Sequence, residues 1–116
     1  MTTARLFLSG IRARGHHGAR PGEKDHPQEF VVDLDLDVEV GTDHIDATAD
    51  YRVISDAVRS IVSDRSFDLI ETMASDIAVA VHELAHVRRV TVVVHKPGAA
   101  ERLGIDGVAA AVTLEG

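Results

Sequence analysis

The chain has 116 residues, and we expect it to form a single domain over residues 1–116. Its net charge of −7 argues against nucleic acids and anionic membranes as partners, because binding phosphate groups requires clustered Lys and Arg. The absence of cysteine and of any long early apolar run favours a cytoplasmic protein without a signal peptide or a membrane span. Only three Phe, one Tyr and no Trp are available for the core, which favours oligomerisation.

Two strands are predicted in the first third of the chain. Residues 4–14 form the first strand, with Gly10 as a candidate bulge, and residues 15–23 form a loop because they are rich in Gly, His and Pro. Residues 30–40 form the second strand, since apolar and acidic side chains alternate with a period of two. This alternation predicts one buried face and one solvated face that carries Asp33, Asp35, Asp37 and Glu39.

The remaining predicted elements are two helices followed by two strands. Apolar residues recur at helical spacing over residues 51–64 and 70–85. Residues 88–96 and 108–114 are predicted strands, and residues 97–107 are a loop containing Gly and Ala. The order of two strands, two helices and two strands predicts an α+β domain with the helices on one face of an antiparallel sheet.

Two charged residues interrupt otherwise apolar segments. Lys96 continues the alternation of the valines before it, so its ammonium group would lie on the apolar face of the strand. It either extends to water or, partly desolvated, takes part in proton transfer. Glu71 lies in the first turn of a predicted helix. Its carboxylate either interacts with the helix dipole or accepts two parallel N–H donors from a guanidine-like ligand edge.

Tyr51 and Glu23 are weaker candidates for a functional site. Tyr51 is the only tyrosine and begins a predicted helix, where its ring packs on the helix or its hydroxyl group faces a ligand. Glu23 lies in the loop that contains Pro21 and Gly22, and by default it is a solvated acid.

Residues 82–86 match the H-E-x-x-H pattern of zinc peptidases. The match lies at the end of a predicted helix, where histidine is favoured by the helix dipole in any case. No helix follows to supply a third ligand, so we expect no metal site.

Several segments of the chain carry a family resemblance when they are taken together and in order. The two most specific are residues 69–74 (LIETMA) and 94–99 (VHKPGA). They are accompanied by residues 8–11 (LSGI), 15–18 (GHHG), Glu23 and 50–51 (DY). Over nearly its whole length the chain resembles the dihydroneopterin aldolases, enzymes of folate biosynthesis.

The resemblance implies the tunnelling fold, a four-stranded antiparallel sheet with two helices inserted between the second and third strands. It implies a homo-oligomer in which sheets associate into a tetrameric ring, usually stacked into an octamer, with pockets between subunits. It also implies a retro-aldol cleavage of a small pterin, 7,8-dihydroneopterin, to 6-hydroxymethyl-7,8-dihydropterin and glycolaldehyde, with C2′ epimerisation as a side activity. No metal or other cofactor is expected, because the C6=N5 imine of the substrate accepts the released electrons.

The resemblance also implies roles for individual residues. Glu71, with the main chain of Ile70, would bind the 2-amino and N3 edge of the pterin. Lys96 would act as a general acid and base near N5, through water. Tyr51 would help to protonate the enol-like intermediate, and Glu23 would bind the substrate hydroxyl groups or the relay water.

Two alternative functions stay open. A dihydroneopterin triphosphate epimerase would need basic residues at the mouth of the pocket, for which the candidates are Arg12, Arg14, Arg20 and Arg102. A non-catalytic pterin-binding or assembly protein is the second alternative, although all four implicated side chains are present. Residues 52–53 and 99–105 depart from the family pattern, so the preference for the substrate side chain is also open.

Overall fold

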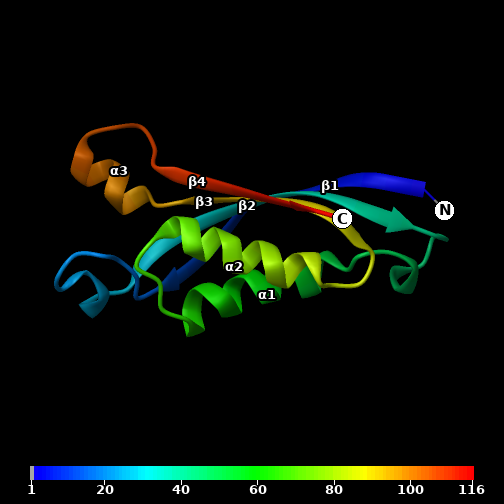
Figure 1. The fold of residues 1–116 in the computed structure, drawn as a ribbon, viewed down its shortest axis with the longest axis horizontal. Coiled ribbons are helices and arrows are strands. Elements are labelled where there is room, and N and C mark those ends of the chain that lie inside the picture. The colour runs from blue at the N-terminus through cyan, green and yellow to red at the C-terminus, as the bar shows by residue number, and fades with distance from the viewer. Residues whose placement is uncertain (1) are drawn as a thin grey trace.

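The structure is a computed structural model that describes residues 2–116. One antiparallel sheet has the order β1-β2-β3-β4 and consists of β1 (Thr2–Gly15), β2 (Gln28–Val40), β3 (Val87–His95) and β4 (Ala109–Glu115). Two long helices, α1 (Tyr51–Asp64) and α2 (Ile70–His82), lie side by side on one face of the sheet, and the other face is uncovered (Figure 1). The predicted α+β class and the insertion of two helices between the second and third strands are confirmed.

The alternation in β2 builds the centre of the core. Its apolar side chains Phe30, Val32, Leu34, Leu36 and Val38 are all buried. Helix α1 packs on β1, and α2 packs on β3 and β4, so each helix covers a different part of the same face. Burying each large aliphatic side chain contributes roughly 1.5–3 kcal/mol, and the sheet and the helices therefore stabilise each other.

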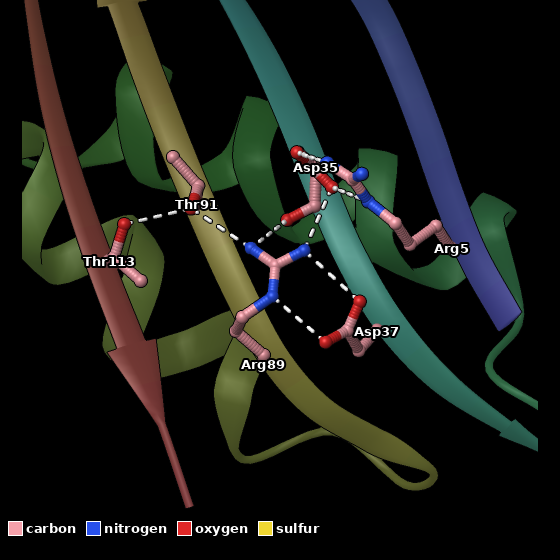
Figure 2. Close-up of polar contacts among 6 residues, drawn as sticks. All are labelled: Arg5, Asp35, Asp37, Arg89, Thr91 and Thr113. Atoms are coloured by element: carbon pink, nitrogen blue, oxygen red, sulfur yellow. Dashed lines mark hydrogen bonds and ion pairs between the residues drawn. The ribbon is translucent and has the colours of Figure 1, made fainter. Parts of the chain in front are cut away.

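The uncovered face of the sheet carries a network of ion pairs centred on Arg89 (Figure 2). The Arg89 guanidinium donates to Asp37 Oδ2 and to Asp35 Oδ1, both at 2.9 Å. Arg5 Nη2 lies 2.7 Å from Asp35 Oδ2. Hydrogen bonds from Arg5 and Arg89 lower the pKa of Asp35, and those from Arg89 lower the pKa of Asp37. The face is solvated as predicted, and Asp35, Asp37 and Glu39 are paired with arginines from the neighbouring strands.

Gly10 forms the bulge that its position in β1 predicts. The pairing of β1 with β2 shifts register between Leu8 and Ile11, and Gly10 has a φ of 73°. Its N–H donates to Asp33 Oδ1 over 2.7 Å. Glycine suits this position because other residues are strained in the left-handed region.

The predicted end of α2 is wrong by three residues. The helix ends at His82, and Glu83 N–H bonds back to the Val79 carbonyl. The chain must then reverse to enter β3, and His86 takes a φ of 69° in this turn. His82 and His86 therefore do not share a helix face, and the geometry that the H-E-x-x-H pattern requires is not formed.

Part of the predicted loop 97–107 is instead a short helix, α3 (Pro97–Leu103). Pro97 stands at its first position and Gly104 follows it with a φ of 69°, the arrangement typical of a helix start and a helix end. Lys96 is consequently the N-cap of α3 and lies just beyond the end of β3. Within residues 2–116, no helix has both the length and the apolar character needed to cross a membrane.

Candidate active site

A cleft of about 480 Å³ lies between α3, the start of α2 and the loop that follows β1. Its lining includes Glu23, Ile70, Glu71 and Lys96. These are four of the five residues predicted for the site, and they come from three separate parts of the chain. The fold therefore brings together a carboxylate and an amine that the sequence only suggested would meet.

Lys96 and Glu23 form an ion pair inside the cleft. Lys96 Nζ lies 2.6 Å from Glu23 Oε2, and the two side chains are only 14% and 13% exposed. The hydrogen bond from Lys96 is the main reason that the pKa of Glu23 is lowered. Because the pair is largely shielded from water, loss of either partner would leave a poorly solvated charge. The pair holds the ammonium group at a fixed point in the cleft.

Glu71 differs from Glu23 because its carboxylate is unpaired. Over residues 2–116, its side chain makes no ion pair or hydrogen bond, and it is exposed. It lies in the first turn of α2, where the N-cap residue Leu69 supplies no side-chain hydrogen bond. Both oxygens of Glu71 are therefore available to a ligand that presents two N–H donors.

The buried imidazole of His17 joins the loop of Glu23 to the segment that leads into α2. Its Nδ1 accepts from the Phe67 N–H at 3.1 Å, so Nε2 carries the proton and donates to the Val62 carbonyl at 2.7 Å. The ring also packs against Phe30 and Phe67. Burial is the main cause of the lowered pKa of His17. Its neutral form is the one that satisfies both hydrogen bonds.

The glycines of residues 15–18 leave space for this arrangement. A Cβ atom on Gly15 would overlap Val62 O and His17 Nε2, and one on Gly18 would overlap the carboxylate of Glu23. Gly18 also has a φ of 140° and donates its N–H to Phe67 O at 2.9 Å. The GHHG pattern at residues 15–18 was the only local sign of this arrangement. The pattern does not identify Val62 and Phe67 as the residues contacted, because they are about 45 to 50 residues away in the sequence.

Tyr51 lies outside the cleft, at the opposite end of the helix layer. Its neighbour Asp50 lines a different hollow together with Leu84 and His86, which follow the end of α2. Glu71 lies at the start of α2, and a helix of 13 residues is roughly 18 Å long. Tyr51 is 55% exposed and does not reach Lys96 within this chain.

The four arginines considered for the pocket mouth divide into two groups. Arg20 and Arg102 line the cleft. Arg12 and Arg14 line a separate hollow beside Arg59 of α1. The sequence could not make this distinction, because it depends on how β1 and α3 are placed around the end of the sheet.

Comparisons with known proteins concern the family and the fold. The dihydroneopterin aldolase family model matches residues 6–113. The dihydroneopterin aldolase of Streptomyces coelicolor is 34% identical over 108 residues, which cover 90% of this chain and 91% of the relative. The dihydroneopterin aldolase of Burkholderia thailendensis, solved with bound guanine, has a TM-score of 0.83 and 25% identity, and the match covers 98% of this chain and 92% of that one. The E. coli dihydroneopterin aldolase, solved with neopterin, has the same fold, with a TM-score of 0.83 and 20% identity over 96% of this chain and 98% of that one.

Proposed function

The chain belongs to the dihydroneopterin aldolase family, and we propose that it cleaves 7,8-dihydroneopterin in the cleft that contains Glu23, Glu71 and Lys96. One observation supports this assignment most directly. The mostly buried Lys96–Glu23 pair, at 2.6 Å, shares a cleft with the unpaired carboxylate of Glu71. A proton-transferring amine and a receptor for a guanidine-like edge are thus available to one small ligand.

Glu71 is the proposed anchor of the pterin ring. Its two oxygens would accept N–H bonds from the 2-amino group and N3, and the main chain of Ile70 would assist. Guanine, which is bound to the Burkholderia relative, presents an equivalent pair of donors on adjacent atoms. Since the Glu71 carboxylate has no protein partner among residues 2–116, it need not break an existing ion pair to bind the ring.

Lys96 is the proposed acid and base. In the retro-aldol step the 2′-hydroxyl group gives its proton to the relay water, the C1′–C2′ bond breaks and glycolaldehyde leaves. The electron pair of that bond passes into the C6=N5 imine, and N5 takes up a proton from Lys96 through water. C1′ is then protonated and N5 gives its proton back, which yields 6-hydroxymethyl-7,8-dihydropterin. Glu23 would hold Lys96 in place and contact the substrate hydroxyl groups or the relay water.

Tyr51 would act on the enol-like intermediate in the cleft of a neighbouring copy. The exposed side chains Leu69 and Leu103 flank the cleft, and Tyr51 and Val53 are exposed at the start of α1. Both β1 and β4 are edge strands with one unpaired side, which a second copy can cover. We therefore propose a tetrameric ring that stacks into an octamer in the cytoplasm, with each site built by two protomers.

Replacing Lys96 with Ala tests the catalytic assignment. We expect kcat for the conversion of 7,8-dihydroneopterin to fall by about 10²–10⁴-fold, as measured by chromatography of the pterin product. The matched control is Lys24→Ala, which removes the only other lysine, a half-exposed partner of Asp68. Wild-type turnover by the Lys96 variant would remove Lys96 from the mechanism, and no turnover by the wild type would favour the non-catalytic alternative.

A mixing experiment tests the shared site. Variants Lys96→Ala and Tyr51→Phe are each expected to be impaired when assembled alone. Reassembly of the two together restores intact sites if Lys96 and Tyr51 come from different protomers, since some interfaces then combine the unchanged residue of each. Light scattering would give the mass of the assembly, and a monomer with full activity would contradict the shared site.

A further inference from the structure

Two arginines in the lining of the cleft, Arg20 and Arg102, have no close carboxylate partner among the residues that the structure describes. Glu23 is paired with Lys96, and Asp68 is paired with Lys24, each at 2.6 Å. The charged side chains that remain in the lining are Glu71, Arg20 and Arg102. If Glu71 binds the ring edge, two guanidinium groups are left facing the rest of the ligand.

Arg102 lies beside the Lys96–Glu23 pair. Its Nη2 is 3.6 Å from Glu23 Oε2, an oxygen that already accepts a much shorter bond from Lys96. Its Nη1 lies over Gly98, where an added Cβ atom would come within 3.3 Å of it. The guanidinium of Arg102 therefore lies beside Glu23 and Gly98. It donates no hydrogen bond among residues 2–116 and its side chain is 58% exposed, so its N–H donors are available to a ligand.

Arg20 flanks the same carboxylate from the other loop. Its main-chain N–H donates to Glu23 Oε1 at 3.4 Å. Its side chain makes no ion pair or hydrogen bond within the described part of the chain, residues 2–116. The two arginines thus border the Lys96–Glu23 pair: Arg20 has no carboxylate partner among residues 2–116, and Arg102 shares Glu23 with Lys96 at a longer distance.

We infer that Arg20 and Arg102 form a subsite for an anionic group at the end of the substrate side chain, namely a phosphate ester. This inference rests on the proposed function, because it requires the ring to be held at Glu71 and the reacting C1′–C2′ bond to lie near Lys96. The side chain then extends past Lys96 toward the two arginines, and guanidinium groups match the oxygens of a phosphate. A chain of net charge −7 repels anions in general, so recognition of a phosphate must come from local arginines such as these.

The phosphate ester changes the product but not the reaction. Cleavage of 7,8-dihydroneopterin 3′-phosphate breaks the same C1′–C2′ bond, and the same C6=N5 imine receives the electrons. The 2′-hydroxyl group again loses its proton, and the leaving fragment is glycolaldehyde phosphate instead of glycolaldehyde. The phosphate stays intact, so no further reactant is needed.

The kinetic test compares 7,8-dihydroneopterin with its 3′-phosphate. For the wild-type protein we expect kcat/KM to be about tenfold or more higher for the phosphate, since hydrogen bonds between guanidinium and phosphate groups are charge-assisted. In Arg20→Gln/Arg102→Gln this preference should disappear while turnover of the unphosphorylated substrate is retained. Arg59→Gln, which removes an arginine from a different hollow, should keep the preference. No preference in the wild type, an unchanged preference in the double variant, or an equal loss for both substrates would each overturn the inference.

A binding experiment separates this inference from the proposed function. Oxidised neopterin and its 3′-phosphate serve as probes, and calorimetry gives their Kd values for the wild type and the double variant. If the wild type cleaves neither substrate yet binds the phosphate about tenfold more tightly through the two arginines, the proposed reaction is wrong and the subsite stands. If the wild type cleaves dihydroneopterin but binds both probes equally, the subsite is wrong and the reaction stands.

Discussion

The uncovered face of the sheet and the cleft at its end both carry acids next to bases, but the charges are arranged differently. On the sheet face, Arg89 is bound to Asp35 and Asp37, and Arg5 is bound to Asp35, in a regular ladder across neighbouring strands (Figure 2). In the cleft, Glu23 is paired with Lys96 and Asp68 with Lys24, but Glu71 remains unpaired among residues 2–116.

This difference separates structural charges from functional ones. The acids of β2 lie at every second residue, so the partners that they need stand on the adjacent strands and the network can form within one sheet. The charges of the cleft lie where strands and helices begin or end, and no regular pairing fixes them together. Glu71 has the dipole of α2 but no cation within residues 2–116 to stabilise it, and an unpaired carboxylate in a cleft is a candidate for ligand binding.

Among the substitutions that test this comparison, the largest expected effect comes from Gly18→Ala, which would disturb the cleft without removing a charge. The new Cβ atom overlaps the Glu23 carboxylate, and the φ of 140° that Gly18 has is strained for alanine. Glu23 must move, so Lys96 loses its partner, and we expect kcat to fall by roughly 100-fold. Gly107→Ala is the control, because a Cβ atom there meets nothing within 4 Å. The assays are carried out at a temperature at which circular dichroism shows that both variants are folded. If Gly18→Ala had the kcat of the wild type, the position of Glu23 would not matter for catalysis.

A second prediction contrasts an unpaired acid with a paired one. Glu71→Gln keeps the shape of the side chain and removes its charge, and we expect kcat/KM to fall by about tenfold to a hundredfold with little change in Tm. Asp35→Asn should do the reverse, lowering Tm and leaving kcat/KM unchanged, because it breaks contacts with Arg5 and Arg89 only. If Glu71→Gln and Asp35→Asn lowered kcat/KM to a similar extent, the distinction between functional charges in the cleft and structural charges on the sheet face would be wrong.

The fold was predictable from the sequence where a local pattern specified it. The alternation in β2 and the helical spacing in α1 each depend on near neighbours, and the predicted bounds of α1 are those observed. Helix α3 was missed, although Pro97 and Gly104 are positioned as helix start and end signals, because seven residues show little periodicity. The end of α2 was misplaced because the turn into β3 depends on tertiary constraints that apolar spacing does not record.

The site was only partly predictable, because its contacts join distant parts of the chain. Glu23 and Lys96 were candidates by resemblance, but their ion pair spans 73 residues and follows from the sheet bringing β1 and β3 to the same end. His17 contacts Val62 and Phe67, which are 45 and 50 residues away, and no local pattern indicates these bonds. Tyr51 was also a candidate by resemblance, but the fold of a single chain does not bring it to the cleft.

A third prediction concerns pH and the loop that positions Glu23. Burial lowers the pKa of His17 below its ordinary value of 6.5, and the positive charges of Lys24, His16 and Lys96 add to this effect. The unfolded chain therefore binds the proton more readily, so the stability contributed by neutral His17 is present above pH 6.5 and is lost as the pH falls toward the lower folded pKa. We expect the wild-type Tm to decline from pH 6.5 to 5, a range above the ordinary pKa of the carboxyl groups.

His17→Gln tests the origin of this decline. An amide can donate to Val62 O and accept from the Phe67 N–H, but it does not titrate, so the Tm of the variant should change less over the same pH range. His44→Gln is the control, because the side chain of His44 is 67% exposed. An equal slope in the wild type and the His17 variant would assign the pH dependence to other groups.

The smallest expected effect comes from the sheet face. Arg89→Met removes the guanidinium that separates Asp35 from Asp37 and leaves the two carboxylates on neighbouring positions of one face of β2. Because these groups are partly exposed to water, we expect Tm to fall by only about 5 °C or less, with unchanged kcat/KM for dihydroneopterin. Arg88→Met, which breaks a single contact with Glu39, should lower Tm less. In 0.5 M NaCl the Debye length is roughly 4 Å. If charge causes the difference in Tm between the two variants, this difference should become smaller at that salt concentration. A difference in Tm that persists in salt would instead indicate lost packing of the aliphatic part of Arg89. A fall in kcat/KM for Arg89→Met would show that the sheet face and the cleft are coupled.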